Sequence, residues 1–225
     1  KNPEKAYPVF VKAMAIARQN GDWDFYLDAL NSSSSLVLAG MNSPTTVPLA
    51  DKQHSERAFN SSKEALKLTK YFKSRGAVAE LHYNVAEFYN AIDDVDTAIY
   101  HYEKAKEIFT SLKGESTKEV AKCYHALGDI YKYNKGDFYE AETNYEKALA
   151  IREKIGFQDT LVLYKNFYSL AATNRSQYDF EKGLSYGSKA MELAKSLDPI
   201  RVEVTTAMVA NIYRDMKESA MGKKY

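Results

Sequence analysis

Apolar residues recur three or four positions apart through most of the chain, which is the spacing of one helix face. The clearest example lies within residues 119–157, where a turn at 134–137 separates two such series. The recurring positions are Tyr124, Leu127, Gly128 and Tyr131, followed by Ala141, Tyr145 and Ala148. The pattern predicts two amphipathic helices joined by a tight Gly-Asp turn.

Small and large residues alternate at these positions for a physical reason. Gly128 and Ala141 are small where two helices must approach closely, and Tyr145 is large where a neighbour leaves space. Close-packed interiors need small residues opposite large ones. We therefore expect the two helices to pack directly against each other.

The order of a large aromatic residue, Leu-Gly, Tyr, and then Ala-x3-aromatic-x2-Ala resembles the tetratricopeptide repeat. The resemblance implies an all-α fold, a right-handed α-solenoid of antiparallel helix pairs. The repeat length here is about 42 residues. This long period is similar to the repeats of kinesin light chains and to the tetratricopeptide arms of bacterial regulators. Such arrays serve many unrelated proteins, so the resemblance specifies the fold more closely than the function.

The pattern divides the chain, read as one array over residues 1–225, into complete and truncated repeats. We expect a lone second helix at 4–20, an irregular repeat at 22–75, complete repeats at 77–113, 117–156 and 160–197, and a truncated repeat at 200–225. In the lone helix, Ala6, Phe10 and Ala13 are predicted to form the packing face. In the truncated repeat, Gly222 is predicted to open a second helix. The repeat at 117–156 carries one extra residue before its turn.

Two segments of the irregular repeat depart from the pattern. Residues 41–53 contain Pro44 and Pro48 and lack the helical spacing of apolar residues, so we expect an insertion there. The insertion is either a structural or mobile loop, or a loop that folds over a binding groove. We expect the next helix to cover 54–74. The run Ser32–Ser35 indicates a tolerated or kinked helix, or else a phosphorylation or ligand-contact patch.

Composition removes several classes of function. A net charge of +1 lacks the basic excess of a nucleic-acid binder, and no apolar run approaches the roughly 20 residues that span a bilayer. The single cysteine, Cys123, favours a reducing compartment, so we expect a cytoplasmic protein. Since the chain begins at Lys1 without Met, we interpret it as a piece of a larger protein.

Motifs for catalysis, cofactors or metals are absent from the sequence, and we expect no enzyme activity, cofactor or metal. His82 is predicted to lie in the core, His101 on the surface and His125 on the inner side of the array. Cys123 is interpreted as a small half-buried hydrophobic residue, although the adjacent lysine favours a reactive thiol. The acidic cluster at 93–96 lacks the pattern of a calcium loop and indicates helix capping.

The inner face of the array is the predicted binding groove. In arrays of this kind the first helix of each pair lines the groove, which leaves these candidate residues: Tyr83, Glu87, Asn90, Lys122, His125, Asp129, Lys132, Lys165, Tyr168, Arg175, Asn211 and Arg214. Glu80 and Tyr133 fall at further inner positions. Three rings share one repeat position, at Tyr83, His125 and Tyr168, and the C-terminal half is basic. This suits an extended, acidic peptide, although lysine and tyrosine also occur on solvated helices.

The leading hypothesis is a scaffold that binds proteins or peptides. One alternative is a regulatory arm of a linked effector, such as a histidine kinase, a DNA-binding regulator or a caspase-like protease. A second alternative is a sensor of small signalling peptides. We expect no nucleic acid or membrane partner, and we expect end-to-end self-association through the truncated repeats.

Overall fold

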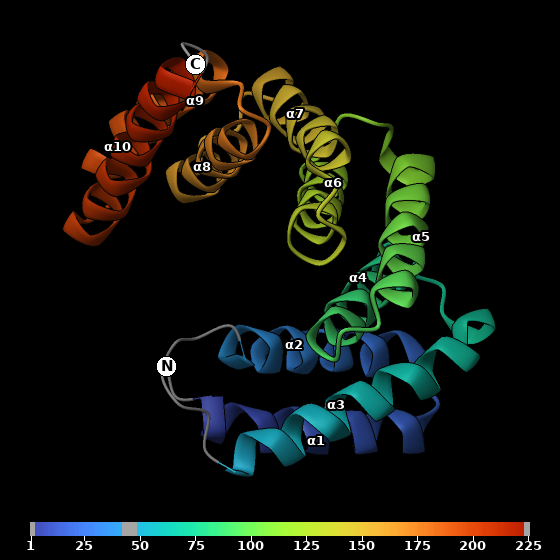
Figure 1. Cartoon of the computed structure of the whole chain (residues 1–225). Helices are drawn as coiled ribbons and strands as arrows, with labels where there is room; N and C mark the ends of the chain where they lie inside the picture. Colours follow the sequence, from blue (N-terminus) through green and yellow to red (C-terminus); the bar gives the residue numbers. More distant parts are fainter. Residues whose placement is uncertain (1–2, 42–48, 223–225) are drawn as a thin grey trace. The chain divides into compact units, whose positions relative to one another are not determined.

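The computed structural model describes residues 3–41 and 49–222, and all regular secondary structure in these ranges is helical (Figure 1). The predicted all-α fold of tetratricopeptide type is confirmed. The chain divides into two compact units, Lys1–Gly114 and Glu115–Tyr225, which are described separately below.

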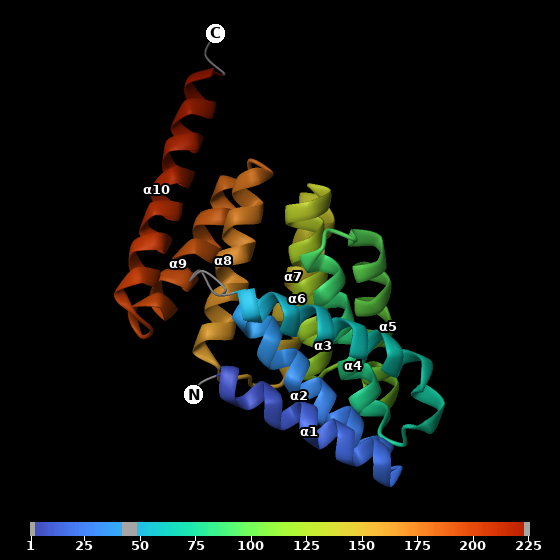
Figure 2. The same cartoon turned by 90° about the horizontal axis from the view of Figure 1, so that it is seen from below.

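Unit 1 is built from helices that pack in sequence order (Figures 1 and 2). Its elements are α1 (Pro3–Asn20), α2 (Trp23–Met41), α3 (Leu49–Lys67), the short 3-10 helix η1 (Thr69–Tyr71), α4 (Arg75–Ala91) and α5 (Val95–Lys113). Helix α1 packs on α2, α2 contacts both α3 and α4, and α4 packs on α5. Leu27, Leu30 and Leu81 are fully buried in the core that these contacts enclose.

The first helix buries a face that overlaps the predicted one, since Phe10 and Ala13 pack against the core of the unit. Tyr7 and Ala17 are buried, whereas Ala6, Phe10 and Ala13 are only half-buried. The Tyr7 ring lies 4.3 Å from the ring of His54 on α3, measured between centroids. Helix α1 packs chiefly on α2, and the Tyr7–His54 contact adds a link to α3.

The boundaries of the irregular repeat also differ from the prediction. Helix α2 ends at Met41 and helix α3 begins at Leu49, so both helices overlap the insertion predicted over 41–53. Pro44 and Pro48 lie outside the described residues. The helix predicted over 54–74 ends at Lys67. A carboxylate oxygen of Asp24 accepts hydrogen bonds from the backbone N–H groups of Lys73 and Ser74, at 2.8 and 3.1 Å, which ties this turn to the start of α2.

The four-serine run lies inside one continuous helix, which supports the interpretation of a tolerated helix. Ser33 and Ser34 are fully buried. The Ser33 hydroxyl donates to the Leu30 carbonyl at 2.8 Å, and the hydroxyls of Ser34 and Ser62 lie 3.1 Å apart. These two serines serve packing between α2 and α3 and are closed to modification.

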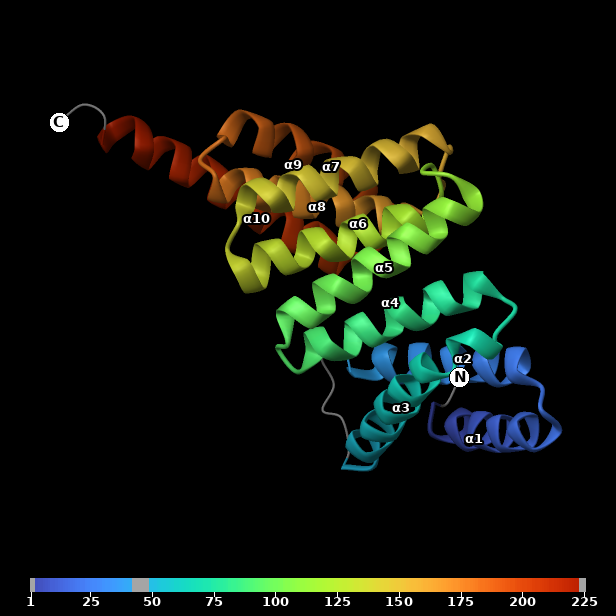
Figure 3. The same ribbon diagram turned by 90° about the vertical axis from the view of Figure 1, so that its right-hand side faces the viewer.

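Unit 2 repeats the same architecture (Figure 3). Its elements are α6 (Lys118–Ile130), the π-helical turn η2 (Tyr131–Lys135), α7 (Phe138–Lys154), α8 (Thr160–Ser176), α9 (Phe180–Lys195) and α10 (Pro199–Gly222). Helices α6 and α7 form one pair, α8 and α9 the next, and α10 packs on α9. Asp137, Asp159 and Asp179 cap α7, α8 and α9 by accepting a hydrogen bond from the backbone three residues on.

The extra residue predicted before the turn of the 117–156 repeat corresponds to η2. A single-residue insertion widens a helix into a π-turn, and such turns are frequent at functional sites. The Asp137 N–H donates to the Tyr131 carbonyl at 2.8 Å, and Gly136 closes the turn with a φ of 66°.

The last helix contradicts the prediction for residues 200–225. Helix α10 runs without a break over 24 residues, and Gly222 is its final residue rather than the start of another helix. Pro199 is its first residue, a position whose backbone N–H has no hydrogen-bond acceptor within the helix, so proline loses no helical hydrogen bond there. Asp198 accepts a hydrogen bond from the Arg201 N–H at 2.9 Å, which supports this start.

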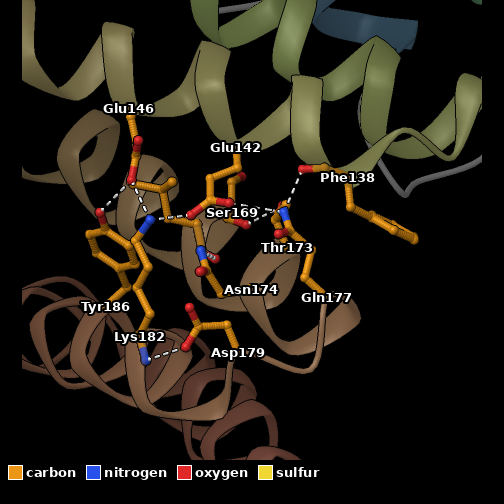
Figure 4. Close-up of polar contacts among 11 residues, drawn as sticks. Phe138, Glu142, Glu146, Ser169, Thr173, Asn174, Gln177, Asp179, Lys182 and Tyr186 are labelled. Atoms are coloured by element: carbon orange, nitrogen blue, oxygen red, sulfur yellow. Dashed lines mark hydrogen bonds and ion pairs between the residues drawn. The ribbon is translucent and has the colours of Figure 1, made fainter.

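A polar network joins the second helices of neighbouring pairs in unit 2 (Figure 4). The Lys182 ammonium contacts carboxylates of both Glu142 and Glu146, the latter at 2.7 Å. The Tyr186 hydroxyl donates to Glu146 at 3.2 Å, and the Gln177 amide donates to Glu142 at 3.0 Å. Burial opposes the lysine charge, but the two carboxylates outweigh it and raise the pKa of Lys182. The network therefore fixes α9 against α7.

Substitution of Gly128 by Ala is predicted to destabilise unit 2 by about 1–3 kcal/mol. A Cβ at Gly128 would lie 2.7 Å from two ring carbons of the fully buried Tyr145, which has no room to retreat. Gly76→Ala in α4 is the control, since a Cβ there meets nothing within 4 Å and should stabilise the helix by about 0.5–1 kcal/mol. Urea unfolding of both variants measures the difference, and equal stabilities would contradict the predicted close contact.

The network predicts a coupling of about 0.5–1 kcal/mol between Glu142 and Lys182, because the lysine side chain is 39% exposed and partly screened. A double-mutant cycle with Glu142→Gln and Lys182→Met, followed by urea unfolding, isolates this value. Additive effects of the two substitutions would show that the contact does not hold α7 and α9 together.

Candidate functional site

The predicted groove residues are divided between the units, and those of unit 1 are largely engaged within it. Tyr83 on α4 is only 9% exposed, and its ring meets the Tyr102 ring edge-on at 5.2 Å between centroids. The Tyr102 hydroxyl donates to Glu87 at 2.7 Å. Asn90 has a buried Oδ1 without a hydrogen-bond partner among the described residues. The first ring of the predicted row is therefore a packing residue in this unit.

The groove residues of unit 2 come from three helices and the π-turn. Helix α6 and η2 carry Lys122, His125, Asp129, Lys132 and Tyr133, helix α8 carries Lys165, Tyr168 and Arg175, and helix α10 carries Asn211 and Arg214. We call these residues the inner face of unit 2. Its most exposed large apolar side chain is Tyr133, at 67%.

Asp129 is the centre of a compact polar cluster on this face. The Tyr145 hydroxyl on α7 donates to Asp129 at 2.6 Å, and the His125 Nε2 lies 3.9 Å from the other carboxylate oxygen. The rings of His125 and Tyr145 are 5.1 Å apart between centroids. Burial raises the pKa of Asp129, and burial together with the Asp129 charge raises the pKa of Tyr145.

His125 is held neutral at this position. Burial, together with the positive charges of Arg152, Lys165 and Lys132, lowers its pKa to about 3. Its Nδ1 atom is buried and has no hydrogen-bond partner in the part of the chain that the structure describes.

Aromatic rings lie beside this cluster. The Lys132 ammonium lies 4.8 Å from the centre of the Tyr133 ring, and burial lowers the pKa of Lys132 to about 8. Tyr168 lies close enough to Tyr133 to contribute to its raised pKa, whose main cause is burial. The structure thus brings together predicted residues of α6, η2 and α8.

Asp215, which the sequence did not indicate as a site residue, partly neutralises the basic residues Arg175 and Arg214 of this face. Asp215 on α10 accepts a hydrogen bond from the Arg175 Nε at 2.6 Å, and the Arg214 Nε lies 3.5 Å from its other oxygen. The one available signal was its position, four residues after Asn211 on the same helix face. Lys132 and Lys165 act electrostatically on Asp129, so a second carboxylate offsets part of the positive charge of this face.

The histidines of unit 1 correct one further expectation. His101, predicted on the surface, is only 8% exposed, and its Nδ1 lies 2.9 Å from the Nδ1 of His82. One ring must donate this hydrogen bond and the other must accept it. Burial lowers the pKa of His82 to about 4, with smaller contributions from His101 and Lys104. Between residues 3–41 and 49–222, no three His, Cys, Asp or Glu side chains converge as metal ligands.

Two other predicted features have structural explanations. Cys123 is fully buried rather than half-buried, which agrees with a hydrophobic packing role. Asp94 of the acidic cluster caps α5 by accepting from the Thr97 N–H at 3.3 Å, which agrees with the capping interpretation. In the described helices, none combines the length and apolarity required to cross a bilayer.

The family model described as "Tetratricopeptide repeat" matches residues 77–154. Solved structures share the fold over most of the chain at low sequence identity. A putative kinesin light chain with nearly identical TPR-like repeats from Podosopora anserina is 14% identical with a TM-score of 0.65, and 88% of this chain and 92% of that chain are covered.

BtubC (BKLC) from P. vanneervenii is 20% identical with a TM-score of 0.59, and the alignment covers 88% of this chain and 93% of that chain. No curated protein matches the sequence significantly. Tetratricopeptide repeat proteins generally act as protein-interaction scaffolds. The chain thus carries tetratricopeptide repeats over residues 77–154, and its paired helices share the fold of solved TPR-like repeat structures.

Proposed function

We propose that the chain is a protein-interaction scaffold and that the inner face of unit 2 binds an extended, acidic peptide. The observation that carries the proposal is the grouping of rings and cations on one face. The Lys132 ammonium lies 4.8 Å from the centre of the Tyr133 ring, Tyr133 interacts electrostatically with Tyr168, and Lys132 and Lys165 both act on Asp129. Aromatic and cationic side chains of this kind are the usual anchors of protein interfaces.

The geometry supports an extended ligand because the candidate side chains follow one another along three first helices. Lys132 lies against Tyr133 on η2, and electrostatic interactions link Tyr133 to Tyr168 on α8 and Tyr168 to Arg175. Arg175 is joined to α10 through Asp215. A peptide lying across α6, α8 and α10 would meet each of these groups in turn.

A regulatory arm or a peptide sensor would use the same face, since either role begins with ligand binding. The control of a linked effector is therefore an extension of this proposal. The self-association expected from the sequence stays a prediction. Its described candidate surfaces are the exposed Val9 and Ile16 on α1 and Ile200 and Val204 on α10.

The proposal predicts that acidic peptides selected from an array bind the chain and depend on this face. Tyr133→Ala and Lys165→Glu should each weaken binding about 10-fold or more, because both side chains are exposed and central to the face. Raising the salt concentration should also weaken binding. Fluorescence anisotropy with labelled peptides measures these affinities.

Matched controls come from exposed residues on other surfaces of the same unit. Tyr139→Ala on α7, where the ring is 72% exposed, and Lys195→Glu on α9 should leave the affinity unchanged. Binding that the control variants weaken as much as Tyr133→Ala and Lys165→Glu would contradict the proposed site, as would a chain that selects no peptide.

A further inference from the structure

Two exposed tyrosine rings of unit 2 lie outside its inner face. Tyr139, on the first turn of α7, is 72% exposed, and Tyr178, in the turn between α8 and α9, is 76% exposed. Among the described tyrosines these two are the most exposed. Neither ring is needed to fill the core of the unit.

A hydrogen bond between the two turns brings these rings to the same edge of the unit. The Gln177 side-chain amide donates to the Phe138 carbonyl at 2.7 Å and to a carboxylate oxygen of Glu142 at 3.0 Å (Figure 4). Tyr139 directly follows Phe138, and Tyr178 directly follows Gln177. The turn before α9 therefore lies against the start of α7, with one exposed ring on each side of the contact.

Tyr178 has an unfavourable backbone conformation. Its φ of 63° lies in the left-handed region, directly before the aspartate that caps α9. The matching residue is Gly136 before α7 and Asp93 before α5, with φ of 66° and 63°. Glycine adopts this conformation freely and aspartate tolerates it, whereas a bulky aromatic residue is an outlier there.

Packing within the chain offsets little of this strain. The Tyr178 ring meets the Phe180 ring edge-on at 6.1 Å between centroids and is otherwise largely in solvent. Strained residues of this kind concentrate at sites where ligands bind. A contact with a partner molecule accounts for a tyrosine at this position.

Negative charge predominates beside both rings. Within three residues of either ring along the chain there are five carboxylates and one cation, namely Asp137, Glu140, Glu142, Asp179, Glu181 and Arg175. Arg175 is paired with Asp215 and Glu142 with Lys182, and two of the other carboxylates cap helices. Neither Glu140 nor Glu181 forms an ion pair with a residue in the described part of the chain. We call Tyr139, Glu140, Tyr178 and Glu181 the turn edge of unit 2.

Arginine side chains complement such an edge. The face of an aromatic ring attracts a cation, and a guanidinium group stacks on it more often than an ammonium group does. A guanidinium group also pairs with a carboxylate through two parallel hydrogen bonds. Tyrosine and arginine are enriched among the residues that carry most of the binding energy of an interface.

We infer that the turn edge of unit 2 docks an arginine-rich segment of a partner protein. Its guanidinium groups stack on Tyr139 and Tyr178 and pair with Glu140 and Glu181. The inference goes beyond the proposed function, since this surface is separate from the inner face and takes a ligand of opposite charge.

The fluorescein-labelled peptide Gly-Arg-Gly-Arg-Gly-Arg-Gly, titrated with the whole chain and followed by anisotropy, tests this docking surface. We expect saturable binding that Tyr139→Ser and Tyr178→Gly each weaken about 5-fold or more, because each removes one stacking ring. Tyr213→Ala on α10, where the ring is 59% exposed beside Arg214, should leave the affinity unchanged. A peptide that does not bind saturably, or an equal loss in Tyr213→Ala, overturns the inference.

Paired glutamate variants separate this edge from the general acidity of the unit. Glu140→Gln combined with Glu181→Gln should weaken binding about 5-fold and reduce its dependence on salt. Glu153→Gln combined with Glu192→Gln is the matched control, since it removes the same charge from exposed positions near the C-terminal ends of the same two helices. Equal weakening by both pairs would indicate non-specific attraction and overturn the inference.

The stability of Tyr178→Gly gives an independent readout of the strained turn. We expect the urea midpoint of unfolding to rise while the affinity for the arginine peptide falls, because glycine adopts a positive φ without steric conflict. A lower midpoint would show that the tyrosine stabilises the turn, and it would overturn the role assigned to the ring.

Tyr133→Ala distinguishes this surface from the inner face. It should weaken binding of acidic array peptides and leave the arginine peptide bound, whereas Tyr178→Gly should do the reverse. Loss of both ligands in either variant would contradict two separate surfaces and overturn the inference. Failure of the acidic peptides alone would remove the proposed function and leave this inference standing.

Discussion

Tyr145 links the packing of the repeat to the chemistry of its inner face. One side of its ring lies against Gly128, where even a methyl group would collide, and its hydroxyl donates to Asp129 at 2.6 Å. The ring is fully buried, so neither contact can shift without the other. The small residue that lets α6 approach α7 thus also sets the position of the polar cluster.

The same arrangement explains why the candidate site lies in unit 2. In unit 1, Tyr102 occupies the matching position and donates to Glu87, and the neighbouring Tyr83 is buried. No π-turn interrupts α4. In unit 2 the extra residue of η2 brings Lys132 and Tyr133 beside Asp129, which adds a cation and an exposed ring to the same framework.

The pattern of small and large residues predicted α4 to α9 well, because packing between repeats requires those residues at fixed intervals. It was only partly right for α1, where Phe10 and Ala13 pack against the core but Tyr7, Met14 and Ala17 are buried more deeply. It failed at Gly222, because a glycine at the end of a helical series does not by itself show where a helix stops or starts.

The site was predicted less completely than the fold, since its properties depend on contacts between residues far apart in the sequence. The spacing of inner positions correctly grouped His125, Asp129 and Lys132 on one face. It did not reveal that Arg175 pairs with Asp215, 40 residues away, or that His101 is buried against His82. Such pairs form only when two helices meet.

We propose that the inner face of unit 2 is the ligand-binding surface. Backbone amide NMR of the chain, recorded with and without an array-selected acidic peptide, locates the bound ligand. We expect shifts concentrated in α6, η2 and α8, with the largest near Lys132 and Tyr168. Shifts concentrated in α1 and α3, or around the exposed Tyr139 and Tyr178, would contradict it.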